Sequence, residues 1–249
     1  MRQFLRLVVL ATASVLAPCS ASAGPAGHAT RDIDLQLVLA ADVSGSMNAS
    51  LRDAQRLGFA AAFRDASLHQ AVSATGTIAI VYFEWAGAAR QDVIIPWTIV
   101  SGPNDLIRLA ERLEGWEVGR SGGETSIVGA MLFARTLLLE GGFRASRRVV
   151  DISGNGRNTE GPDVAEAIEA LREIDATVNG LVLPAAHVEG PYQFTGYDGA
   201  LIDYYRREVI GGPGAFAIEV DPAVGFADAI LRKLVREIAW AASRGHGDG

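Results

Sequence analysis

Residues 35–47 read Leu-Gln-Leu-Val-Leu-Ala-Ala-Asp-Val-Ser-Gly-Ser-Met, an apolar run that ends in alternating oxygen-bearing side chains. The nearly continuous apolar run over 35–41 predicts a strand buried on both faces of a sheet. Helically spaced apolar residues follow over 54–62. A strand, a polar loop and a helix in this order are typical of α/β proteins. Ligands in such sheets bind at the carboxyl ends of the strands, so this loop is the first place to look for a site.

The rest of the chain repeats the alternation of strands and helices. Further strand-like runs occupy 77–83, 93–95, 149–152, 178–183 and 216–220. Helical patterns cover 127–138, a segment beginning near Pro162, and a last helix opening with Asp221-Pro222, which is a good cap and first-turn pair. We therefore predict an α/β fold with a doubly wound, mostly parallel sheet and helices on both faces.

The loop after the first run carries ligands for a hard cation. Its extended backbone turns Asp42, Ser44 and Ser46 towards one side, so that a carboxylate and two hydroxyl oxygens converge. Oxygen ligands with exchangeable waters suit Mg²⁺ or Mn²⁺, and Ca²⁺ is less favoured. The alternative is a polar turn in which Ser46 or Asn48 only caps the following helix.

Three segments resemble, in the right order, the metal-ion-dependent adhesion site of von Willebrand A domains: 42–47, 122–127 and 153–156. Four other segments are similar to an exported, uncharacterised bacterial family of von Willebrand A-like proteins, a domain of unknown function: 83–85, 96–98, 148–154 and 209–216. The resemblance spans roughly 33–240 and implies a von Willebrand A, Rossmann-like fold.

This resemblance implies one divalent ion, Mg²⁺ or Mn²⁺, at Asp42, Ser44, Ser46, Thr125 and Asn155. It also implies a protein partner whose Asp or Glu completes the coordination sphere. Asn155 stands where the pattern has an aspartate, which leaves Asp42 as the one formal carboxylate. Asp151 lies four residues earlier, about 13 Å down an extended strand, so we expect it to pair with Arg147, Arg148 or loop amides instead.

The first residues have the three-part layout of a secretory signal peptide. Arg2 and Arg6 precede an apolar run over 7–17 that is too short to span a bilayer, and Ala21-Ser22-Ala23 forms a cleavage site. We expect cleavage after Ala23 and a periplasmic or secreted protein. A lipoprotein anchored through Cys19, the single cysteine, is disfavoured by the preceding proline.

The expected organisation is a signal peptide over 1–23, a flexible lead over 24–31, one von Willebrand A-like domain over 32–243 and a polar tail over 244–249. The formal charge of −7 becomes −9 once Arg2 and Arg6 are removed with the signal peptide. A nucleic-acid partner is therefore not expected, because phosphate backbones require a basic surface. No integral membrane segment is expected in the mature chain.

Catalytic motifs are weak. The chain has no G-x-S-x-G, no H-E-x-x-H and no phosphate loop, and its four histidines are scattered. A metal- or serine-dependent hydrolase and a metal-free interaction scaffold are the alternatives to a binding module. The tyrosines and phenylalanine over 192–205 are equally compatible with a recognition surface and with a packed cover.

Overall fold

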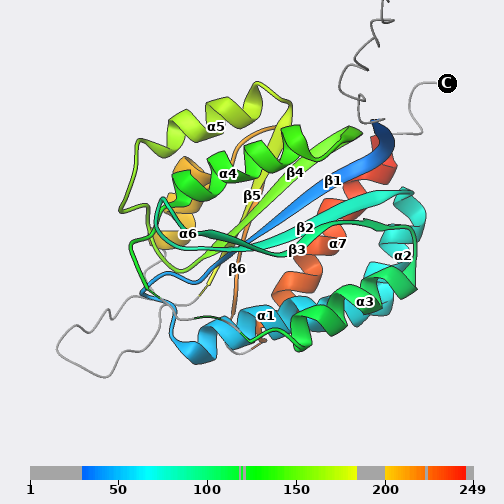
Figure 1. Cartoon of the computed structure of the whole chain (residues 1–249), viewed down its shortest axis with the longest axis horizontal. Coiled ribbons are helices and arrows are strands. Elements are labelled where there is room, and N and C mark those ends of the chain that lie inside the picture. Colours follow the sequence, from blue (N-terminus) through cyan, green and yellow to red (C-terminus); the bar gives the residue numbers. More distant parts are fainter. Residues whose placement is uncertain (1–29, 118, 120–121, 184–199, 222–223, 245–249) are drawn as a thin grey trace, which may run out of the picture.

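A computed structural model describes residues 30–117, 119, 122–183, 200–221 and 224–244 (Figure 1). The elements within these residues are β1 (Arg31–Asp42), α1 (Ala49–Arg64), α2 (Ala66–Thr75), β2 (Ile78–Trp85), β3 (Gln91–Val100), α3 (Pro103–Glu114), α4 (Ile127–Glu140), β4 (Phe143–Gly154), α5 (Val164–Arg172), β5 (Ala176–Val182), α6 (Ala200–Tyr204), the π-helical turn η1 (Tyr205–Val209), β6 (Ala217–Glu219) and α7 (Phe226–Arg244). The proposed signal peptide and its cleavage site lie outside the described residues.

The strands form one sheet in the order β3-β2-β1-β4-β5-β6. Neighbouring strands are parallel except β2 and β3, which are antiparallel. The strand order reverses direction between β1 and β4, whose ends pair Ala41 with Ser153. This arrangement confirms the predicted doubly wound, mostly parallel sheet, and each predicted apolar run contributes to a strand.

Helices cover both faces of the sheet, and a separate apolar core lies under each layer (Figure 1). On one face α1, α2, α3 and α7 bury Phe59, Leu68, Leu106 and Ile230 against alternate residues of β1 and β2. On the other face α4, α5, α6 and η1 pack on Val38, Val81 and Val150. Two covered faces explain why β1 is buried from Leu35 onwards and β2 along its whole length.

The last helix begins later than the sequence predicts. Asp221 accepts backbone hydrogen bonds from Val224 and Gly225 at 3.0 and 2.9 Å, and Gly225 has a φ of 102°. A positive φ is incompatible with a right-handed helix. Helix α7 therefore starts at Phe226, after a turn.

Two helices on the α7 face were not predicted. Helix α3 has an apolar stripe of Leu106, Leu109, Ala110 and Leu113 behind Pro103 in its first turn. That stripe was readable in the sequence. Helix α2 is short and follows α1 directly, because Asp65 ends one helix and caps the next.

Asp151 pairs with α7 rather than with its neighbours on β4, so the predicted pairing with Arg147 or Arg148 is wrong. Its Oδ1 lies 2.6 Å from Nζ of Lys233, and the same ammonium lies 2.5 Å from Oε1 of Glu237. Asn179 of β5 donates to Glu237 at 2.9 Å. All four side chains are buried. Strand alternation turns Asp151 to the α7 face, out of reach of the loops at the strand ends.

This cluster holds two carboxylates and one ammonium. Burial raises the pKa of Asp151 to about 7, opposed by the charge of Lys233 and assisted by that of Glu237. A carboxyl group whose pKa is higher in the folded than in the unfolded protein stabilises the fold at low pH. That contribution is lost as the pH rises through the folded value.

We therefore expect the free energy of unfolding of metal-free protein to fall between about pH 4 and pH 7, by up to ~1.4 kcal/mol per pH unit for this group, and to level off above about pH 7. Asp151→Asn should flatten this slope, as denaturant titrations in EDTA at several pH values will measure. Asp32→Asn, which changes an exposed ion pair with Arg144, is the control and should keep the slope. A slope unchanged by Asp151→Asn would refute the role of the cluster.

Candidate functional site

The five residues that the sequence singles out lie together where the sheet reverses its strand order. Asp42 is the last residue of β1, and Ser44 and Ser46 lie in the turn before α1. Thr125 directly precedes Ser126, which caps α4, and Asn155 directly follows β4. Three loops, far apart in the sequence, thus meet at the carboxyl ends of two central strands.

The hydroxyl and amide oxygens of these residues form a chain of contacts. Thr125 Oγ1 lies 3.3 Å from Ser44 Oγ, and Ser44 Oγ lies 3.3 Å from Ser46 Oγ. Ser46 Oγ donates to Asn155 Oδ1 at 2.6 Å, and Asn155 Nδ2 donates to the Ser46 carbonyl at 3.1 Å. Both contacts of the Ser44 hydroxyl, at 3.3 Å, are longer than an ideal hydroxyl–hydroxyl hydrogen bond. They are therefore the weakest contacts of this chain.

Asp42 lies behind this chain. Its Oδ1 accepts the backbone N–H of Ser44 at 2.7 Å, and its Oδ2 accepts that of Asn155 at 3.4 Å. The carboxylate is therefore held by the backbone of both loops that it joins. The second bond is long, which leaves Oδ2 weakly satisfied.

Buried polar groups fix the loop backbone. Gln55 of α1 donates to the Asp42 carbonyl at 3.1 Å and accepts from Ser153 at 2.7 Å. Gly45 donates its N–H to the carbonyl of Gly123 at 3.1 Å, and Gly123 has a φ of 87° that favours glycine. These bonds position the loops independently of any ligand.

The electrostatic environment of the Asp42 carboxylate favours a cation at the site. The side chain is fully buried, and burial raises its pKa to about 6 against the hydrogen bonds from Ser44 and Asn155. Within the part of the chain that the structure describes, no Lys or Arg contributes to this pKa. A buried carboxylate without a cation is costly. Among the described residues no group of three or more His, Cys, Asp and Glu side chains is placed to hold a metal, so a cation here would rely on hydroxyls.

The site is open on one side. Gly45 and Ser46 are exposed, whereas Asp42 and Ser44 are fully buried. Asn48 rather than Ser46 caps α1, with its Oδ1 accepting the Leu51 N–H at 2.9 Å. Ser46 is therefore not used by the helix. The oxygen donors fit a hard divalent cation that also contacts solvent.

Several other aromatic and polar side chains make structural contacts. Trp85 is fully buried next to Asp42 in the sheet register, and Trp97 donates to the Leu137 carbonyl at 3.2 Å. His69 contacts the Phe63 carbonyl through its ring nitrogen at 2.9 Å. Ser153 donates to the Ala40 carbonyl and to Gln55. Its hydroxyl is therefore not poised as a nucleophile.

The aromatic segment over 192–205 is described only in part. Tyr192, Phe194 and Tyr197 lie outside the described residues. Tyr204 is half-buried, with its hydroxyl accepting the Asn158 N–H at 3.2 Å, and Tyr205 is fully buried. Tyr205 lies beside the site. The sequence does not distinguish it from Tyr204, because two adjacent tyrosines give no sign of which one faces the strand ends.

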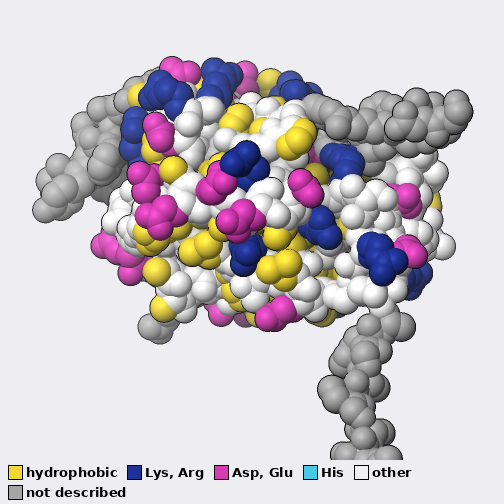
Figure 2. Space-filling view, turned by 90° about the horizontal axis from the view of Figure 1, so that it is seen from above, with side chains coloured by type: hydrophobic (Ala, Val, Ile, Leu, Met, Phe, Trp, Pro, Cys, Tyr) yellow, Lys and Arg dark blue, Asp and Glu magenta, His cyan; other side chains and the backbone are white. Residues whose placement is uncertain are grey.

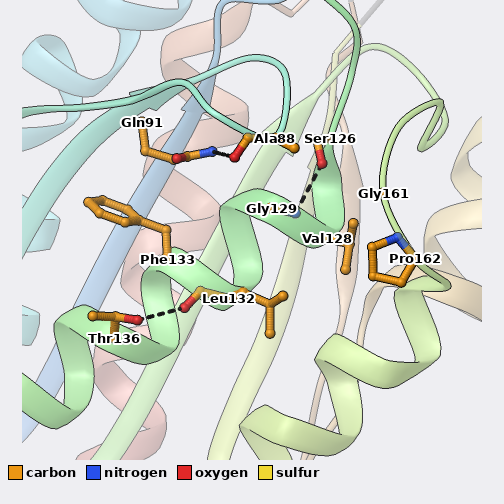
Figure 3. A pocket seen from close by; sticks show the side chains of 10 residues that line it. All are labelled: Ala88, Gln91, Ser126, Val128, Gly129, Leu132, Phe133, Thr136, Gly161 and Pro162. Atoms are coloured by element: carbon orange, nitrogen blue, oxygen red, sulfur yellow. Dashed lines mark hydrogen bonds between the residues drawn. The ribbon is translucent and has the colours of Figure 1, made fainter.

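A pocket of about 340 Å³ lies beside α4 (Figure 3). Its lining is mainly apolar and comes from the β2–β3 turn, α4 and the loop before α5: Ala88, Gln91, Ser126, Val128, Gly129, Leu132, Phe133, Thr136, Gly161 and Pro162. It touches the loop before α4 through Ser126 but includes none of the five oxygen donors. We assign it no chemistry.

The molecular surface above α4 and α5 carries charges of both signs. Figure 2 shows Lys and Arg side chains interspersed with Asp and Glu, with hydrophobic side chains between them. This face offers no continuous basic patch for a polyanion. None of the described helices is long and apolar enough to cross a membrane.

Comparisons with known proteins agree with this architecture. A family model described as "Protein of unknown function (DUF1194)" matches residues 32–242. A search of curated proteins finds no match. Proximal thread matrix protein 1 from the mussel byssus is similar, with 14% identity over 86% of this chain and 48% of that chain, and a TM-score of 0.53.

The same mussel protein with a zinc-occupied MIDAS motif gives 16% identity over 85% of this chain and 46% of that chain, with a TM-score of 0.50. The pilus adhesin SpaC from Lactobacillus rhamnosus GG gives 12% identity over 84% of this chain and 31% of that chain, with a TM-score of 0.58. A von Willebrand factor type A protein from Catenulispora acidiphila gives 14% identity over 86% and 43%, with a TM-score of 0.49.

This chain spans about half of the mussel protein and less of the adhesin. At these identities the likeness concerns the fold alone. That fold is the von Willebrand A-like α/β fold that the sequence resemblance implied.

Proposed function

Because this chain belongs to the family described as "Protein of unknown function (DUF1194)", we propose a function from its own site: an exported, divalent-metal-dependent protein-binding module of the adhesion type. Asp42, Ser44, Ser46, Thr125 and Asn155 hold one Mg²⁺ or Mn²⁺ ion. When bound, the ion supplies a positive charge that attracts an Asp or Glu of a protein partner.

One observation carries this proposal. Asp42 is fully buried, with no cationic partner among the described residues, at the meeting point of three loops that present oxygen atoms. The desolvated carboxylate provides the anionic ligand, and the hydroxyls of Ser44 and Thr125 add neutral ones. Ser46 is exposed on the side from which a partner approaches, and its hydroxyl donates to the buried Asn155.

The likeness to a mussel protein with a zinc-occupied MIDAS motif and to a pilus adhesin supports an adhesion-type role. With one formal carboxylate, the site neutralises a divalent ion only in part. A partner's carboxylate then gains more from the remaining charge than it would beside two aspartates, while the affinity for the ion itself is lower.

A metal-free interaction scaffold is the second candidate, and one observation favours it. Ser46 and Asn155 form a reciprocal pair of hydrogen bonds at 2.6 and 3.1 Å. This pair joins the two loops through protein groups alone. In that case partner binding would depend on loop shape and not on divalent cations.

Replacement of the buried carboxylate tests the anionic ligand. Asp42→Asn should lower Mg²⁺ affinity by about a hundredfold or more, because an ion–carboxylate attraction of several kcal/mol is lost. The stability of the metal-free protein should stay level or rise, because a neutral amide replaces a desolvated charge. Calorimetric titration and denaturant unfolding measure the two effects. Glu166→Gln, an exposed change on α5, is the control, and equal Mg²⁺ affinities of Asp42→Asn and wild type would refute the assignment.

The residue that departs from the pattern gives a second prediction. Asn155→Asp adds a charge at nearly constant shape, so Mg²⁺ and Mn²⁺ affinity should rise about tenfold. It also replaces a donor that bonds the Ser46 carbonyl at 3.1 Å, so the metal-free variant should be less stable. Titration and unfolding of the same preparations measure both. Unchanged metal affinity would remove Asn155 from the site; binding only in the variant would favour the metal-free scaffold.

Partner capture tests the function itself. Envelope extract passed over immobilised protein should yield a partner in Mg²⁺ that is lost in EDTA and is not captured by Asp42→Asn. At saturating metal, Asn155→Asp should capture that partner equally or less well, because its extra carboxylate reduces the positive charge left for the partner. Capture that persists in EDTA would refute the adhesion-type mechanism.

A further inference from the structure

The Tyr205 side chain brings a buried hydroxyl to the rear of the site. The residue is fully buried, and its hydroxyl has no hydrogen-bond partner among the described residues. Leaving such a group unsatisfied is destabilising, so its position calls for an explanation.

The backbone around Tyr205 is built to deliver this hydroxyl. Tyr205 opens the π-helical turn η1, in which the N–H of Ile210 donates to the Tyr205 carbonyl at 3.0 Å. Turns of this kind are rare and frequently lie at functional sites. Glycines on two neighbouring strands make room for the side chain. A Cβ at Gly180 would lie 2.8 Å from the Tyr205 ring, and one at Gly154 would lie 2.7 Å from its hydroxyl.

The hydroxyl ends close to the weakly satisfied oxygen of Asp42. The point where a Gly154 Cβ would stand is 2.7 Å from the Tyr205 hydroxyl and 3.0 Å from Asp42 Oδ2. The two oxygens are therefore no farther apart than about two hydrogen-bond lengths, although they are not bonded directly. A separation within this limit admits a single bridging water.

A second donor lies at the same place. Trp85 Cζ2 is 3.4 Å from that point, and the indole Nε1, two bonds away, also has no partner among the described residues. A phenol, an indole N–H and a carboxylate oxygen together are a set that one buried water satisfies, since such waters typically bond to about three polar groups. Burial, assisted by the charge of Asp42, raises the pKa of Tyr205 well above its usual range, so the phenol remains a donor.

We infer that Tyr205 is a positioning residue for the metal ligand Asp42: through one buried water, shared with Trp85, its hydroxyl donates to Asp42 Oδ2 and holds the carboxylate facing the loops. This inference rests on the proposed function. It assigns Tyr205 no direct contact with the ion. The hydroxyl acts by satisfying the carboxylate oxygen that Asn155 binds only at 3.4 Å.

The test compares two adjacent tyrosines. Tyr205→Phe removes the hydroxyl and should lower Mg²⁺ and Mn²⁺ affinity about fivefold, as expected for the loss of one water-mediated bond to a charged group. Tyr204→Phe is the matched control, because its hydroxyl accepts the N–H of Asn158 instead. Its metal affinity should equal that of wild type in calorimetric titration of the full chain.

A spectroscopic readout separates positioning from packing. Mg²⁺ addition should perturb the ultraviolet absorption of the buried phenol in wild type and in Tyr204→Phe, and this difference band should be lost in Tyr205→Phe. Equal metal affinities of wild type and Tyr205→Phe would overturn the inference while the proposed function stands. Absence of Mg²⁺ and Mn²⁺ binding by wild type would overturn both.

If Tyr205→Phe fails to fold, the variant Gly154→Ala provides a second test of the inference. Its methyl carbon would lie 2.7 Å from the Tyr205 hydroxyl and 3.0 Å from Asp42 Oδ2, which is too close, so the two groups must move apart and the water bridge between them is broken. Metal affinity should then fall by at least as much as is expected for Tyr205→Phe, about fivefold. Wild-type affinity in a folded Gly154→Ala protein would overturn the inference.

Discussion

The structure depends on one buried carboxylate that has no cationic partner among the residues described. Asp42 stands at the end of the central strand β1, fully buried, and its oxygens depend on the backbone of two loops. Gln55, Ser153, Gly45 and Gly123 fix these loops through buried or backbone bonds. The fold thus accepts an unfavourable charge at the place where strand order reverses and ligands usually bind.

A second buried carboxylate has a structural role. Asp151, four residues before Asn155, faces Lys233 and Glu237 of α7. There the cation is part of the chain, and the cluster joins β4, β5 and the last helix without opening to solvent. Asp151 has an ammonium partner within the chain, whereas Asp42 has none among the described residues. We therefore propose only Asp42 as a metal ligand.

Much of the fold could be predicted from the sequence, because buried parallel strands leave long apolar runs and each run contributes to a strand. The five oxygen donors also lie together as expected, since their motif segments follow strands or precede a helix. The partner of Asp151 was missed because Lys233 is 82 positions away and only helix packing brings it near. The predicted start of α7 is wrong because Asp221-Pro222 resembles a helix cap and first turn. Gly225 has a positive φ, so the helix begins only at Phe226. Tyr205 could not be chosen over Tyr204 without knowing the π-helical turn.

The direction of β1 has a geometric consequence for any tethered form of the protein. The described chain enters at the amino end of β1 and leaves at the end of α7, and both lie at the edge of the sheet opposite the loops that hold Asp42 and Asn155 (Figure 1). Twelve residues of β1 separate the point of entry from the site, a length of roughly 40 Å at the rise of an extended strand. Residues 30 and 244, where the described domain begins and ends, therefore lie far from the loops of the site. The length of the sheet separates both chain ends of the domain from the surface that a partner would contact.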